Sequence, residues 1–173
     1  ENFIEIAKLC SISYFNQDFM HKTFQDIDCI DVIDNRKVIK KCIKSPKLYS
    51  SSKCCQVYIF EFEDTIYICF RGTESIDDLI TNIKIKQKEF ILPNFNQGYY
   101  PSVHQGFLEQ FNSVKDLIST EINLEKKIIF CGHSLGGALA SIAGLYYSYL
   151  FDNINFCCIT FGAPRAGNYL FSR

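Results

Sequence analysis

An unusually long uncharged stretch constrains this fold more than any other feature. Residues 128–151 carry no formally charged side chain at neutral pH, and a membrane-spanning helix needs only about 20 apolar residues. Glycines divide the stretch into a β-branched part and a small-residue part, at Gly132, Gly136, Gly137 and Gly144. A buried strand over 127–131, a sharp turn and a helix over 135–149 therefore fit the pattern better than a membrane span.

The rest of the chain alternates between helical and strand-like patterns. Apolar spacing predicts helices over 2–14, 76–83 and 104–122, and β-branched or aromatic runs predict strands over 38–43, 56–62, 65–70 and 155–161. The strands 56–62 and 65–70 are close enough for a tight hairpin. Lysines at 84, 86 and 88 alternate as they would in an edge strand, and 97–101 is predicted to be a loop. This order indicates an α/β fold with parallel central strands.

Composition limits the classes of protein that the chain can belong to. A length of 173 residues with 47% hydrophobic and 21% charged residues indicates a single globular domain over residues 1–173. The net charge of −1 argues against a nucleic-acid partner. The nine cysteines include no CxxC pair and are odd in number. We therefore expect no metal site, and the cysteines weakly favour a reducing, intracellular compartment, although the localisation stays open.

One motif carries nucleophilic chemistry. Residues 132–136 read G-H-S-L-G, a G-x-S-x-G pattern placed where the predicted strand meets the predicted helix. In a nucleophile elbow of this kind the serine occupies a strained turn, and the flanking glycines prevent collisions with the neighbouring strand and helix. We predict that Ser134 is a nucleophile and that the N–H of Leu135, at the positive end of the helix, stabilises an oxyanion.

Four blocks then match one family in order. They read FRGT at 70–73, VHQGF at 103–107, GHSLGGALA at 132–140 and TFGAPRAGN at 160–168. The chain resembles the fungal-type, or class 3, lipases of the α/β-hydrolase fold. This resemblance implies a three-layer α/β sandwich with a mostly parallel central sheet, here lacking its C-terminal strands. It also implies that Thr73 supplies the second oxyanion N–H, and it requires no cofactor.

The segment 75–83 resembles the family's lid, and its apolar residues would contact substrate. These residues are Ile76, Leu79, Ile80 and Ile83, with Leu79 standing where many relatives carry tryptophan. A buried core helix is the alternative interpretation of the same pattern. Arg71 and Arg165 are expected to anchor loops by ion pairs. The alternating lysines are expected to form a solvated edge, with contact to an anionic lipid surface as the alternative.

The acid and base of a catalytic triad are not evident in this sequence. An α/β-hydrolase orders its triad as Ser, then Asp or Glu, then His, yet no histidine follows Ser134 and the only later carboxylate is Asp152. His133 is expected to be structural, and His104 is the alternative base. We expect the acid and base to lie beyond Arg173, so that this chain is a C-terminally truncated domain.

The sequence thus predicts a serine ester hydrolase that acts on acyl-lipid esters, at a lipid–water interface, without a transmembrane segment. The acyl group would be carried on Ser134 as an acyl-enzyme. The activity of these 173 residues alone is doubtful. The alternative is a catalytically inactive hydrolase-like scaffold that binds lipid or a protein partner.

Overall fold

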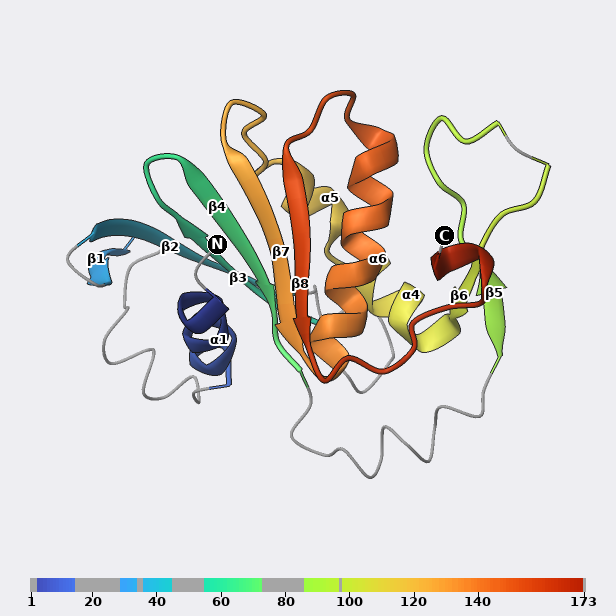
Figure 1. Cartoon of the computed structure of the whole chain (residues 1–173), viewed down its shortest axis with the longest axis horizontal. Coiled ribbons are helices and arrows are strands. Elements are labelled where there is room, and N and C mark those ends of the chain that lie inside the picture. Colours follow the sequence, from blue (N-terminus) through green and yellow to red (C-terminus); the bar gives the residue numbers. More distant parts are fainter. Residues whose placement is uncertain are drawn as a thin grey trace.

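A three-layer α/β sandwich forms the body of the protein. The computed structural model describes residues 3–14, 29–33, 36–44, 55–72, 86–96 and 98–172. A twisted six-stranded sheet lies between helix α1 on one face and helices α4, α5 and α6 on the other (Figure 1). The helices of the described residues are α1 (Phe3–Ile12), α4 (Gln105–Asn112), α5 (Lys115–Ser119) and α6 (Leu135–Leu150), followed by the short 3-10 helix η1 (Leu170–Ser172).

The central sheet is mixed, and its parallel part carries the G-x-S-x-G turn. Its order is β1-β2-β3-β4-β7-β8, with antiparallel pairing from β1 to β4 and parallel pairing from β4 to β8. The strands are β1 (Cys29–Ile33), β2 (Arg36–Lys44), β3 (Gln56–Glu61), β4 (Thr65–Phe70), β7 (Lys127–His133) and β8 (Phe156–Phe161). Strands β2, β4, β7 and β8 run in the same direction. The carboxyl ends of β4, β7 and β8 therefore share one edge of the sheet, the lower edge in Figure 1.

Alternation along β7 divides the core into two apolar layers. Ile128 and Phe130 pack against α6, whereas Ile129 and Cys131 pack against α1. All four side chains are buried, which is why this strand reads as a continuous apolar run. On the α6 side, Tyr147 stacks on Phe130 with ring centroids 5.5 Å apart. The uncharged stretch is thus a core strand and its crossover helix.

Most of the predicted elements are confirmed with small shifts at their ends. The strands predicted at 56–62 and 65–70 form the β3–β4 hairpin, closed by a hydrogen bond from Phe62 N to Thr65 O at 2.8 Å. The helices predicted at 2–14 and 135–149 are α1 and α6. Within the part of the chain that the structure describes, no helix is long and apolar enough to cross a membrane. The predicted helix at 76–83 lies outside the described residues.

The prediction of one long helix over 104–122 is wrong. The structure forms two helices, α4 and α5, with a break at Ser113 and Val114. The Ser113 hydroxyl donates to the Gln110 carbonyl at 2.6 Å, and Val114 adopts φ −126°. A serine that bonds to the backbone in this way offers the chain an alternative to continuing the helix. The buried side chains on both sides of the break still face one core, so their spacing resembles that of a single helix.

The lysine-rich edge belongs to a second, smaller sheet. Strand β5 (Gln87–Glu89) is exposed at all three positions and pairs antiparallel with β6 (Ser102–His104). Sequence analysis did not predict β6, since three residues are too few for a visible alternation. Lys88 lies within β5 opposite Val103, whereas Lys84 lies outside the described residues. The predicted loop at 97–101 lies between these two strands.

Candidate active site

Ser134 occupies a sharp turn between β7 and α6. Its backbone angles are φ 53° and ψ −125°, a conformation that L-residues other than glycine rarely adopt. The turn is held on one side by a hydrogen bond from Ser134 N to Phe161 O at 2.9 Å, at the end of β8. On the other side, the Ser134 carbonyl accepts from the Gly137 N–H at 2.9 Å. This is the strained strand-to-helix geometry expected of a nucleophile elbow.

Two glycines allow this turn to be so tight. A Cβ on Gly132 would overlap the backbone carbonyl of Gly136 and come within 2.8 Å of Gly137 N. A Cβ on Gly136 would in turn overlap the carbonyl oxygen of Phe70, at the end of β4. Strand β7, helix α6 and strand β4 therefore approach one another more closely here than side chains would permit.

The first turn of α6 provides an electropositive environment next to Ser134. Leu135 is the first residue of the helix, and the first N–H groups of an α-helix have no intrahelical acceptor. The helix macrodipole adds partial positive charge at this end. The Ser134 side chain does not cap the helix, and the residue is only 5% exposed. The Ser134 side chain and the first N–H groups of α6 thus lie together at the carboxyl edge of the sheet.

The four sequence blocks converge around this edge. Phe70 pairs with Gly132 across β4 and β7, which joins the first block to the third. The fourth block begins in β8 and continues beyond it to Asn168. The N–H of His104 donates to the carbonyl of Ala166 at 2.9 Å, and this hydrogen bond joins the second block to the fourth. The Asn168 side chain strengthens this junction, because its Oδ1 accepts from Ser102 N at 3.2 Å. Motifs up to ninety residues apart in sequence are thereby brought to one end of the molecule.

Two arginines in these blocks contact neighbouring segments of the chain. Arg71 donates from Nη1 to Oε1 of Gln56 at 2.6 Å, at the start of β3. Arg165 donates from Nε to the carbonyl of Gly167 at 2.9 Å. Both side chains brace loops, as expected, and the contacts described here are hydrogen bonds to an amide oxygen and a backbone carbonyl.

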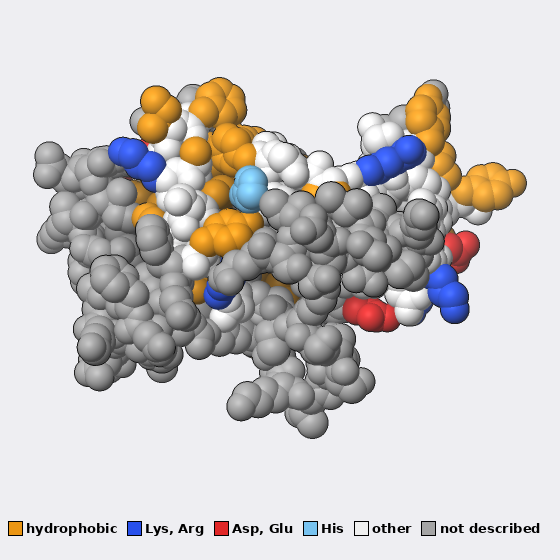
Figure 2. Space-filling view, turned by 90° about the horizontal axis from the view of Figure 1, so that it is seen from below, with side chains coloured by type: hydrophobic (Ala, Val, Ile, Leu, Met, Phe, Trp, Pro, Cys, Tyr) orange, Lys and Arg blue, Asp and Glu red, His pale blue; other side chains and the backbone are white. Residues whose placement is uncertain are grey.

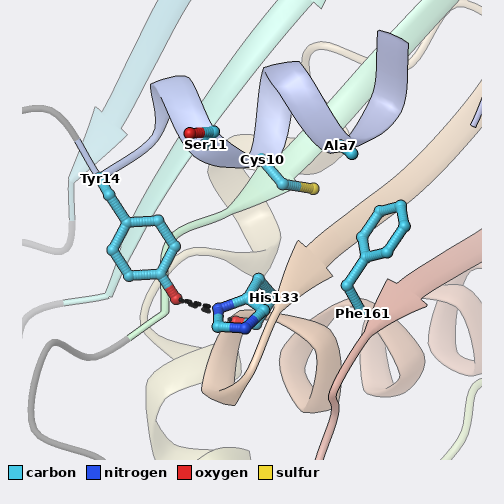
Figure 3. Close-up of a pocket in the computed structure, with 6 residues that line it drawn as sticks. All are labelled: Ala7, Cys10, Ser11, Tyr14, His133 and Phe161. Carbon is cyan, nitrogen blue, oxygen red and sulfur yellow. Dashed lines mark hydrogen bonds between the residues drawn. The ribbon is translucent and has the colours of Figure 1, made fainter. Parts of the chain in front are cut away.

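His133 faces the α1 side of the sheet. The Tyr14 hydroxyl lies 2.8 Å from His133 Nδ1 and 3.3 Å from the His133 carbonyl oxygen, and Figure 3 shows the two side chains meeting beneath α1. Viewed from the carboxyl edge of the sheet, hydrophobic side chains lie beside a histidine on the described part of this face (Figure 2). The pocket between α1 and the sheet edge is lined by Ala7, Cys10, Ser11, Tyr14, His133 and Phe161.

The other two candidates for a catalytic acid or base, His104 and Asp152, lie on different elements of the fold. His104 ends β6, and its ring packs on Phe107 with centroids 4.3 Å apart. Asp152 is exposed and follows the C-terminal end of α6, a helix of 16 residues. At about 1.5 Å per residue, that end lies about 24 Å from Ser134, too far for a triad contact. His21 lies outside the described residues.

Comparison with known proteins identifies the family of this chain. The sequence profile of the family described as Lipase (class 3) matches residues 67–173, which include all four blocks. The chain belongs to the class 3 lipase family. A lipase of Rhizomucor miehei is 31% identical over 156 residues, and a secreted mono- and diacylglycerol lipase of Fusarium solani is 34% identical over 113 residues.

Solved structures support the same assignment. The native propeptide complex of the Rhizomucor miehei lipase superimposes with a TM-score of 0.65 at 26% identity, and the match covers 95% of this chain and 52% of that one. In sequence, the matches cover 84% and 62% of this chain but only 40% of the Rhizomucor protein and 32% of the Fusarium protein. This class 3 lipase chain therefore spans well under half the length of these curated relatives.

The structure describes part of the site that the sequence predicted. It places Ser134 and Leu135 together at the turn. Thr73 and the lid residues Ile76, Leu79, Ile80 and Ile83 lie outside the described residues. Sequence analysis missed the contribution of Tyr14, which reaches from the end of α1 to His133. No motif marks this tyrosine, because its contact depends on how α1 packs against the sheet.

Proposed function

We propose that this chain carries the nucleophile and oxyanion site of a carboxylic ester hydrolase acting on acyl-lipid esters. The observation that supports this proposal most directly is the backbone of Ser134, which holds φ 53° between a buried strand and the start of α6. Strain of this kind persists only where the surrounding structure enforces it, and it is concentrated at functional sites. Lipases among the relatives supply the substrate class.

The proposed reaction proceeds through an acyl-enzyme. The Ser134 oxygen attacks the ester carbonyl carbon while a general base takes its proton, and a tetrahedral intermediate with a negatively charged oxygen forms. The intermediate collapses as the alcohol leaves with a proton, and water then hydrolyses the acyl group from Ser134. The N–H of Leu135 would stabilise the oxyanion in both halves of the reaction. Thr73 would supply the second donor, as the family resemblance implies.

We propose that the general base and its acid lie outside residues 1–173. No histidine follows Ser134 in the sequence, and Asp152 is separated from it by the length of α6. A serine hydroxyl without its base is a weak nucleophile at neutral pH. Residues 1–173 would then form one part of a larger hydrolase domain.

The 173-residue chain alone is therefore expected to hydrolyse esters very slowly. In a serine protease, the oxyanion site and binding alone retain only about 10³ to 10⁴ of rate acceleration over water once the triad is lost. A short-chain chromogenic ester assayed with the chain, with His104→Ala and with Ser134→Ala measures this residual rate. Fast hydrolysis that depends on both Ser134 and His104 would contradict the proposal and assign the base to His104.

If residues 75–83 form a lid, activity should rise when the substrate passes from monomers to aggregates. Opening such a lid exposes an apolar face that a lipid surface can cover. In a protein that contains the complete domain, replacing Leu79 and Ile80 with serine should reduce this rise while leaving the rate on monomeric ester nearly unchanged. Rates are measured across the solubility limit of a short-chain triacylglycerol. Equal rates below and above that limit in the unmodified protein would favour a buried core helix.

A further inference from the structure

Three cysteines from separate elements meet beneath α1. Cys10 lies on α1, Cys69 on β4 and Cys131 on β7, and their Sγ atoms all lie within 4.8 Å of one another. Cys69 and Cys131 are paired residues of the parallel β4–β7 ladder, so their side chains emerge on the same face. Cys69 Sγ donates to Cys10 Sγ at 3.6 Å. All three side chains are at most 2% exposed.

This spacing fits a single thiophilic cation. Zn²⁺ binds thiolates at about 2.3 Å, which places the sulfurs of a tetrahedral site about 3.8 Å apart. Soft thiolate ligands select Zn²⁺ and similar cations over hard ions such as Mg²⁺. We propose that Cys10, Cys69 and Cys131 form a zinc site that ties α1 to the two strands leading to the Ser134 turn. The absence of a CxxC motif hides this site in the sequence, since its ligands are brought together only by the sheet and the helix packing.

The charges of the cluster are compatible with a divalent cation. Hydrogen bonds from Cys131 and Cys69 hold the pKa of the Cys10 thiol below its usual range, and the nearby His133 acts in the same direction. Those hydrogen bonds to Cys10, together with burial, raise the pKa values of Cys69 and Cys131. Binding of Zn²⁺ requires that the thiol ligands lose their protons, and the charge of the divalent cation offsets most of the negative charge that this places in the buried cluster.

A surface pocket reaches Cys10, one member of the cluster. Cys10 lines it together with His133, Tyr14 and Phe161, and its volume is about 460 Å³. In Figure 3 the Cys10 side chain points from α1 toward the β7 end where His133 lies. This pocket provides an entry path for the ion and room for a water molecule as the fourth ligand. Three protein ligands and one open position are a common arrangement for zinc.

Zinc binding to the reduced 173-residue chain tests the proposal without any measurement of ester hydrolysis. Competition with a chromophoric chelator should show one ion per chain, and X-ray absorption should show three sulfur neighbours at about 2.3 Å. Cys69→Ala and Cys131→Ala should each weaken binding by more than about 100-fold, since loss of an outer-shell partner alone costs up to that much. Cys158→Ala is the matched control, because Cys158 is exposed and lies on the opposite face against Gly144 of α6. Its affinity should be unchanged.

The absorption measurement on the unmodified chain needs no variant, so it stands even if a core substitution prevents folding. Fewer than three sulfur neighbours, or no zinc bound by the folded reduced chain, would overturn the proposal. Equal affinities of Cys69→Ala and the unmodified chain would do the same. If air instead produces a Cys10–Cys69 disulfide and the reduced chain binds no zinc, the cluster is a redox pair and the zinc site is refuted.

Discussion

Replacing Ser134 with alanine is expected to lower ester turnover by about 10⁶-fold in a protein that contains the complete hydrolase domain. The alanine variant lacks the oxygen that would form the acyl-enzyme, whereas the Leu135 N–H and the rest of the site remain. Only the acceleration from the oxyanion site and substrate binding should persist. Turnover of a chromogenic acyl ester under saturating substrate measures this loss.

Ser141→Ala provides the matched control for this experiment. Ser141 lies two turns along the same helix, is partly buried and donates to the Gly137 carbonyl at 3.0 Å. Its loss should leave turnover within a few-fold of the unmodified protein. An acyl-site organophosphonate should modify Ser134 alone, because its tetrahedral adduct resembles the intermediate held by the oxyanion donors. Mass spectrometry that found the same labelling in Ser134→Ala would refute the assignment of the nucleophile.

The turn at Ser134 could be predicted from sequence because its sequence signals are local, although its contacts with Phe161 and Phe70 are not. Three features within a few positions of Ser134 indicate the turn. They are the β-branched run before it, the glycines around it and the small residues after it. The positive φ of Ser134 then follows from the same short segment. The hairpin between β3 and β4 was predictable for the same reason, since its turn and both its strands are contiguous.

Features that depend on distant packing were not predictable. The break between α4 and α5 escaped detection because Phe111, Val114 and Ile118 are all buried and keep a helix-like spacing across it. Strand β6 exists through its pairing with β5 and its contact with Gly167, and neither is visible in three residues of sequence. The meeting of Cys10, Cys69 and Cys131 likewise requires the β4–β7 register and the position of α1.

The motif glycines also link the candidate site to the stability of the fold. Gly136 packs directly on the backbone at the end of β4, and β4 leads into the Arg71–Gly72 segment of the first block. A bulkier side chain at this contact would displace either the start of α6 or the end of β4. The residues that position Ser134 are therefore the same residues that close the sheet against the helix.

Gly136→Ala is accordingly expected to lower the free energy of unfolding by about 3 kcal/mol, the upper end of the usual cost of overpacking. The new Cβ would overlap the Phe70 carbonyl oxygen and lie 2.9 Å from the Phe70 carbonyl carbon. These are backbone atoms of a buried strand, so they cannot rotate away as a side chain could. Urea denaturation of the 173-residue chain, followed by circular dichroism, measures the change in midpoint at constant slope.

Gly144→Ala makes the same substitution in the same helix and should have the opposite sign. Its Cβ would lie 3.5 Å from the nearest atom, Cβ of Cys158, which is an ordinary van der Waals contact. Alanine in a helix interior is favoured over glycine by about 0.8 to 1 kcal/mol, so this variant should be more stable by a similar amount. Helix propensity can differ between these two positions by at most about 1 kcal/mol, so a larger difference between the variants reports the close approach of α6 to β4. Stabilisation by both substitutions would show that this approach is looser than the backbone distances indicate.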